Sequence, residues 1–156
     1  MTPFYVQFFL ALFATVGFCV IIRVPLRCMP GCAAVGAIGW MVYELTFYYL
    51  SSPVMGCFVG ACAVGILSTI FSKLFKDAST IFTIPGILCL VPGFNIYSTM
   101  AAMLKHDLQG TFSTGLETLL MAGAIALGLL VIGATLGVIK RLIRTTISIK
   151  DYFVLK

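Results

Sequence analysis

The stretch FTIPGILCLVPGF, residues 82–94, decides how the fourth apolar segment of this chain folds. It is apolar enough for the interior of a membrane, yet it contains two Pro-Gly pairs, Pro85-Gly86 and Pro92-Gly93. Proline removes a backbone donor and clashes with the preceding helical turn, and glycine weakens a helix interior. The stretch therefore predicts a helix that is interrupted twice, at a depth where free peptide groups are costly.

The composition places the whole chain in a membrane. Of 156 residues, 61% are hydrophobic and 10% are charged, with a mean hydropathy of +1.13. Soluble domains are about 45–50% apolar and about 25% charged. We therefore predict an all-α integral membrane protein, with residues 1–156 forming a single transmembrane domain. The first apolar run lacks a preceding basic region and a cleavage site, so we expect it to be retained as a span.

Charge and cysteine content exclude two other classes of function. The net charge of +5 comes from ten basic residues scattered at the ends of apolar runs, which does not favour nucleic-acid binding. The six cysteines lie almost entirely in apolar runs and lack CxxC spacing, so we expect neither a metal nor a cofactor. No nucleophile-base motif is present, and we expect no enzymatic activity.

Five apolar runs are long enough to cross about 30 Å of hydrocarbon, which takes about 20 helical residues. They are residues 4–22, 30–49, 54–72, 80–104 and 115–139, and a basic tail follows at 140–156. Five crossings place nine basic residues on one side and only Lys105 on the other. Basic residues near short loops remain in the cytoplasm. This predicts an outside amino terminus and a cytoplasmic carboxyl terminus in the plasma (inner) membrane.

Two GxxxG pairs predict close helix packing. Gly56 and Gly60 lie in the third span, and Gly133 and Gly137 lie in the fifth. Small residues let helix backbones approach each other in lipid, where hydrophobic drive between helices is weak. Either the pairs pack this bundle internally, or at least one of them docks another subunit, including a second copy of the chain.

Few polar residues interrupt the spans. Glu44 lies inside the second span, where a carboxylate is costly. It is either a proton or substrate relay, or a carboxylate that reaches the outer interface. Glu117 is predicted to be a charge near a helix N-terminus. His106 and Asp107 are predicted to be solvated in the loop at 105–114.

The two prolines of the opening stretch lie seven residues apart, two helical turns, so both breaks are predicted on one face. Pro85 frees the carbonyl of Ile81, and Pro92 frees that of Leu88. Broken backbone is tolerated at membrane depth where it is buried in protein or lines a watery cavity, and transporters use such helices to hold substrates. This pattern predicts a substrate site.

The same residues resemble those of a known family. The runs IPGI at residues 84–87 and LVPG at 90–93, with Tyr97 four residues on, resemble the threonine/serine exporter family. VPLR at 24–27 and GAIG at 36–39 are similar to its split small subunit, the YjjB type. The family commonly has a proline where this chain has Cys89.

The resemblance implies a larger membrane partner of the YjjP type and export of small carboxylates such as succinate. We therefore expect a subunit of a proton-gradient-driven exporter of threonine and serine, or of dicarboxylates. The predicted substrate-facing part is the backbone of Pro85–Gly93 together with Asn95 and Tyr97. Arg27 is predicted to draw anions toward the cytoplasmic mouth, and Glu44 to couple protons. A non-transporting membrane scaffold and a homo-oligomeric channel are the alternatives.

Overall fold

The computed structural model describes the backbone of residues 4–154 and the side chains of residues 4–138. Across these residues the chain forms six helices and no strand, which confirms the all-α prediction. The helices are α1 (Phe4–Ile21), α2 (Met29–Leu50), α3 (Pro53–Phe75), α4 (Ser79–Leu88), α5 (Gly93–Leu104) and α6 (Leu108–Val154).

Local sequence signals set the helix ends. Proline lies in the first turn of both α2 and α3, at Pro30 and Pro53, where its missing N–H is no loss. Ser51 after α2 and Lys76 after α3 adopt left-handed backbone conformations. Their N–H groups donate to carbonyls of the last helical turn, which ends each helix at that residue.

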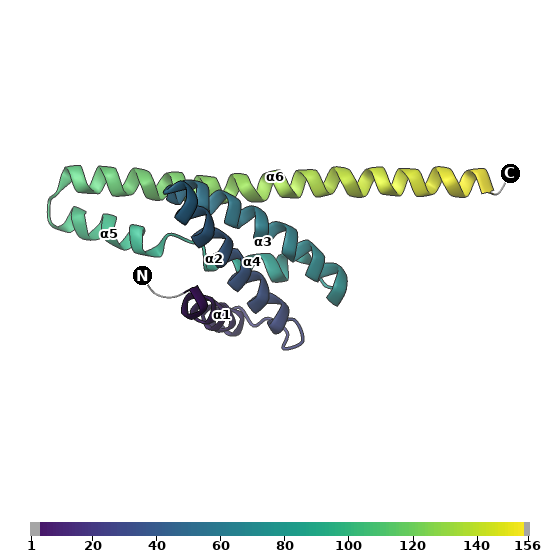
Figure 1. Ribbon diagram of the computed structural model, residues 1–156, viewed down its shortest axis with the longest axis horizontal. Helices are drawn as coiled ribbons and strands as arrows, with labels where there is room; N and C mark the ends of the chain where they lie inside the picture. The colour runs from purple at the N-terminus through teal and green to yellow at the C-terminus, as the bar shows by residue number, and fades with distance from the viewer. Residues whose placement is uncertain (1–3, 155–156) are drawn as a thin grey trace.

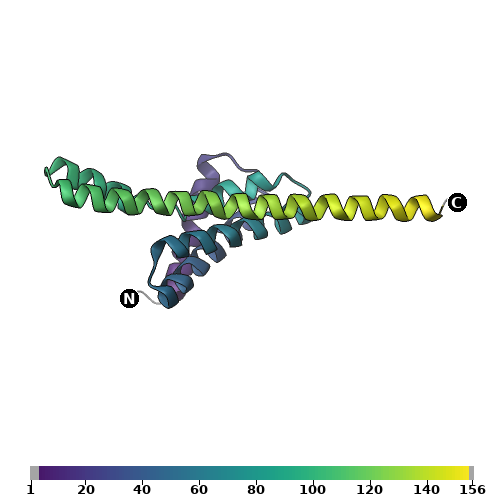
Figure 2. The ribbon, with the colours of Figure 1, turned by 90° about the horizontal axis from the view of Figure 1, so that it is seen from above.

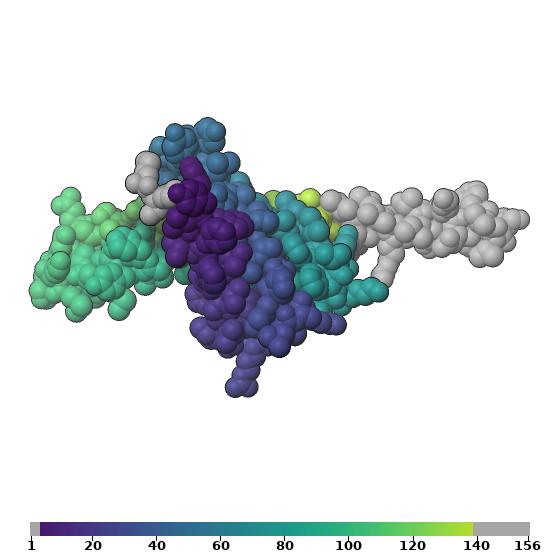
Figure 3. Space-filling model, turned by 60° about the horizontal axis from the view of Figure 1, so that its bottom comes forward, coloured from purple at the N-terminus to yellow at the C-terminus, as the bar shows by residue number. Residues whose placement is uncertain are grey.

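Helices α1 to α4 form one cluster, and α6 runs past it along the long axis of the molecule (Figures 1 and 2). Within the cluster α2 packs against α1, α3 and α4, and α3 also packs against α4 and α6. Helix α5 packs along the first part of α6. The resulting hairpin projects beyond the cluster on one side (Figure 3).

A small residue lets α4 lie close to α2 and α3. A Cβ added at Gly31 of α2 would lie 2.9 Å from a ring carbon of Phe82. The ring of Phe82 in α4 lies 5.7–6.2 Å, centroid to centroid, from those of Phe75 and Phe71 in α3. This aromatic cluster fills the space that the glycine leaves, as expected where helix packing in lipid depends on close contact.

Among the described residues, three helices are long and apolar enough to cross a membrane: α1, α3 and the Leu108–Val138 part of α6. The pair α4 and α5 passes the same test jointly, with a bend of 46° between them. The described residues thus contain three candidate spans, or four if the bent pair crosses, as fits a multi-pass membrane protein. The predicted count of five is not confirmed. Helix α2 has 22 residues, but Glu44 and three tyrosines lower its hydropathy.

The loop predicted at residues 105–114 is much shorter in the structure, because α6 begins at Leu108. Asp107 caps the helix: its side chain accepts the Gly110 N–H at 3.0 Å, and its carbonyl accepts the Thr111 N–H at 2.9 Å. An acidic cap at this place stabilises the helix start. The basic tail predicted at 140–156 lies outside the residues whose side chains are described.

Candidate functional site

Only one of the two predicted breaks is present. Helix α4 continues through Pro85, which is buried, and ends three residues later at Leu88. Pro85 does deprive the carbonyl of Ile81 of its helical donor. The thiol of Cys32 on α2 donates to this carbonyl, with 3.3 Å between sulfur and oxygen. A neighbouring helix thus satisfies the freed carbonyl, and the helix persists.

Gly86 also belongs to packing. A Cβ at this position would lie 2.9 Å from Cγ1 of Val35 and 3.1 Å from Cγ1 of Val64. Both valines are completely buried. The first Pro-Gly pair therefore faces α2 and α3.

The second Pro-Gly pair breaks the helix. Residues 89–92 separate α4 from α5, and two short-range bonds turn the chain there. The Leu90 N–H donates to the Ile87 carbonyl at 2.7 Å, and the Gly93 N–H donates to the Val91 carbonyl at 2.8 Å. Helix α5 then begins at Gly93 and is bent by 46° relative to α4. The break thus separates two apolar helices at a bend, an arrangement that the discontinuous helices of transporters also have.

Cys89 ties the break to α1. Its sulfur lies 3.0 Å from the hydroxyl oxygen of Thr15 and 3.7 Å from the carbonyl oxygen of Ala11. The Thr15 hydroxyl is fully buried and donates to the same Ala11 carbonyl at 2.7 Å. These contacts hold the start of the break against α1.

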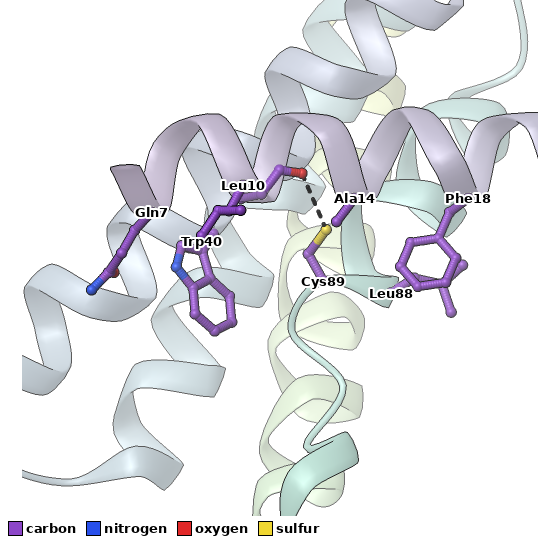
Figure 4. Close-up of a pocket in the computed structure, with 8 residues that line it drawn as sticks. Gln7, Leu10, Ala14, Phe18, Trp40, Leu88 and Cys89 are labelled. Carbon is purple, nitrogen blue, oxygen red and sulfur yellow. Dashed lines mark hydrogen bonds between the residues drawn. The ribbon is translucent and has the colours of Figure 1, made fainter. Parts of the chain in front are cut away.

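A pocket of about 310 Å³ opens beside the break, beneath α1 (Figure 4). Five residues of α1, one of α2 and two at the end of α4 line it: Gln7, Leu10, Ala11, Ala14, Phe18, Trp40, Leu88 and Cys89. Gln7 and Trp40 lie at one end, Phe18 and Leu88 at the other, with Cys89 between them. The lining offers an amide, an indole N–H and a thiol, and none of these eight residues is charged.

The polar residues after the break point elsewhere. The Asn95 side chain donates to the sulfur of Met121 on α6 at 3.4 Å. Tyr97 is 69% exposed, and within the described part of the chain no atom beyond the adjoining helical turn lies within 4 Å of a Cβ added at Gly93. None of the three lines the pocket. The structure therefore does not bring them together with the end of α4.

Arg27 lies on the exposed loop between α1 and α2 and pairs with Asp77 on the loop between α3 and α4, at 2.7 Å. The thiol of Cys28 donates to the same carboxylate oxygen at 3.1 Å. Hydrogen bonds from Cys28 and Arg27 hold the pKa of the Asp77 carboxyl below its ordinary value. The two loops, expected on one side of the membrane, lie together. The charge of Arg27 is already balanced there.

The two GxxxG pairs have different surroundings. A Cβ at Gly56 would lie 2.9 Å from the Tyr43 ring, and one at Gly60 would lie 2.6 Å from Leu90. Among the described residues, no atom beyond the adjoining part of α6 lies within 4 Å of a Cβ at Gly133 or Gly137. The pair in α3 therefore lies against α2 and the break, whereas the pair in α6 lies on an open face.

Glu44 is half-buried on α2 and lines neither of the two described pockets. Sequence reasoning missed Gln7, Thr15 and Trp40, which surround the break. Their only signal is that each interrupts an apolar run with a polar group. The structure adds that Thr15 contacts Cys89, and that Gln7 and Trp40 line the same pocket as Leu88 and Cys89.

Comparison with known proteins covers the same part of the chain. The family model described as "Threonine/Serine exporter, ThrE" matches residues 7–135, from the start of α1 through the break to α6. The chain belongs to the threonine/serine exporter family. The resemblance predicted from residues 84–97 is thereby confirmed, and the apolar helices fit a membrane transporter of this family.

One curated relative of this exporter-family chain is an uncharacterized protein of Haemophilus influenzae. It is 27% identical over 122 residues, which cover 73% of this chain and 41% of that protein. The chain thus spans about two fifths of the length of the relative it matches. No solved structure matches the chain.

Proposed function

We propose that this protein is a membrane subunit of a secondary exporter of small carboxylates, threonine and serine or dicarboxylates, driven by the proton gradient. Its family membership supports the exporter class. The observation that carries the proposal is the break at residues 89–92, because a pocket lies beside it. Broken helices beside a cavity are the usual substrate sites of secondary transporters.

The exporter acts with a larger membrane partner. Many transporter sites form between two structural repeats, and this chain offers one broken helix. The Haemophilus influenzae relative is more than twice as long as the part that this chain matches, so it has room for a second half. The hairpin of α5 and α6 carries large exposed apolar side chains, including Phe94, Leu104 and Phe112, that lipid or a partner can cover.

The charged residues take roles outside the pocket. Glu44 on α2 is the proposed proton-coupling group, and Arg27 is the proposed anion guide at the cytoplasmic mouth. Because Arg27 forms a salt bridge with Asp77, the carboxylate of an incoming substrate has to compete with the Asp77 carboxylate for the guanidinium. The amino terminus is outside and the carboxyl terminus is cytoplasmic in this proposal, in the inner membrane.

The experiment is an efflux assay for threonine, serine and succinate in cells that carry this chain, its partner, both, or neither. We expect efflux above background only with both chains, and its loss when a protonophore collapses the gradient. Efflux from the partner alone at the full rate would make this chain a scaffold. Flux that persists without a gradient would make it a channel.

Two variants test the break in the same assay. Pro92→Ala restores an N–H that can bond to the Leu88 carbonyl, so the helix straightens and efflux per assembled complex falls. Gly93→Leu places a large side chain where the pair of helices has open space and is expected to reduce efflux without reducing the amount of complex. Parent rates in both would move the site away from the break, first to Glu44.

A further inference from the structure

We propose that the pocket beneath α1 is the place where the exporter holds its substrate, and that the pocket selects a small amino acid of zero net charge over a dicarboxylate. This inference rests on the proposed export function and adds the site and its charge preference. Leu88, the last residue of α4, and Cys89, the first residue of the break, form one wall of the pocket.

The pocket has the right size for one small molecule. Its volume of about 310 Å³ is at the lower end of the range of about 300–1,000 Å³ that is typical of small-molecule sites. A water occupies about 30 Å³, so a small amino acid fits with a few waters. Helices α1, α2 and α4 all contribute to the wall, so a change at the break changes the pocket.

The wall offers hydrogen-bonding groups that suit an amino acid. Trp40, at one end, carries an indole N–H donor, which a carboxylate accepts. Leu88, at the other end, has lost the helical donor of its carbonyl because residue 92 is proline. A freed carbonyl is an acceptor for an ammonium or hydroxyl group. Phe18 and Ala14 add apolar surface for a short aliphatic side chain.

The wall offers no charge to balance a dianion. None of its residues is basic, and Arg27 is on the loop, paired with Asp77. Moving an unbalanced charge out of water costs several kcal/mol or more, and a second negative charge adds to that cost. The two opposite charges of a zwitterion attract each other and attenuate its field. The pocket therefore favours threonine or serine over succinate.

Trp40 allows a direct test of binding, because it is the only tryptophan of the chain and lines the pocket. The efflux-competent assembly is purified, and its fluorescence is titrated with threonine and with succinate. The same titration of Trp40→Phe supplies the background of other tryptophans. We expect a saturable change for threonine that disappears in Trp40→Phe, and none for succinate. A saturable Trp40 signal for succinate alone would overturn the charge preference.

Cys89 supplies a second readout with a matched control. Cys89 and Cys62 are the two cysteines that are only partly buried, and Cys62 lies between α3 and α6, away from the pocket. Threonine at about ten times its dissociation constant should slow N-ethylmaleimide labelling of Cys89 about tenfold, because about a tenth of the sites remain empty. Labelling of Cys62 should not change. Equal slowing, or none, at both cysteines would contradict the site.

A third variant changes the pocket volume. Ala14→Leu fills the pocket from α1, and we expect threonine efflux per assembled complex to fall about tenfold, with serine, smaller by one methyl, affected less. Gly17→Leu on the same helix is the control, since no described atom outside the adjoining part of α1 lies within 4 Å of its added Cβ and it does not line the pocket. It should export at the parent rate with an unchanged threonine-to-serine ratio.

The two levels of proposal fail in different ways. If cells with both chains export none of the three compounds, the proposed function is wrong. If they export, but Ala14→Leu keeps the parent rate and ratio while threonine changes neither Trp40 fluorescence nor Cys89 labelling, the pocket is not the substrate site and the exporter stands.

Discussion

The clearest test of the packing concerns Cys32 and Pro85. In the structure the Cys32 thiol donates to the carbonyl of Ile81, whose helical donor is missing because residue 85 is proline. Cys32→Ala would leave that carbonyl without a donor. A buried polar group left unsatisfied costs about 1–3 kcal/mol, and a thiol is a weak donor, so we expect the loss of this bond to destabilise by about 1 kcal/mol.

A double-mutant cycle isolates this contribution. Pro85→Ala restores the N–H that bonds to Ile81, and the thiol is then no longer needed. Cys32→Ala should therefore cost about 1 kcal/mol less in the Pro85→Ala background than in the parent. The loss of sulfur volume is common to both backgrounds and cancels. The assay is the free energy of unfolding in micelles, measured by steric trapping for the parent, both single variants and the double variant.

Cys57→Ala is the matched control. Cys57 is also fully buried, but it lies on α3 and makes none of the hydrogen bonds described above. Its cost should be the same with proline or alanine at position 85. A coupling between Cys32 and Pro85 below about 0.3 kcal/mol, the scatter of independent sites, would refute the reasoning. The continuation of α4 would then need another cause.

Three further predictions follow from contacts, charges and loop positions. Gly60→Leu should destabilise the folded chain by about 1–3 kcal/mol, because its Cβ would lie 2.6 Å from a neighbouring side chain. Gly133→Leu, with open space around it, should leave the free energy of unfolding unchanged. Equal effects of the two substitutions would contradict the packing. The pKa of Asp77 is held down by the thiol and the guanidinium beside it, so their contribution is complete above the unfolded pKa and is lost as pH falls through the folded pKa. Thermal melts should show this acid loss in the parent and a smaller one in Asp77→Asn. A membrane-impermeant thiol reagent should label Ser51→Cys but not Lys76→Cys in intact cells; the reverse labelling would invert the topology.

The sequence alone determined the class of the protein and much of its helical outline. The apolar runs at 4–22 and 54–72 became α1 and α3 with ends shifted by a few residues, because length and hydropathy are local properties that membrane helices follow directly. The break before Gly93 could also be predicted, since proline removes its own N–H wherever it lies. Family membership followed from a short motif around that break.

Only the tertiary structure decided which proline breaks the helix. Pro85 and Pro92 sit in similar Pro-Gly pairs, and each frees a carbonyl by the same chemistry. Cys32, more than fifty residues upstream of Pro85, satisfies one of those carbonyls through space. No local pattern contains that partner, so the sequence predicted two breaks where one exists.

The pocket was decided in the same way. Gln7 and Trp40 come from two separate helices and Cys89 comes from the break after α4, and each is ordinary in its own stretch of sequence. Their meeting depends on how α1 crosses α2 and the end of α4, which the tie between Thr15 and Cys89 helps to set. Residues that are neighbours along the chain determine where a helix forms. A cavity is instead bounded by residues that only helix packing brings together.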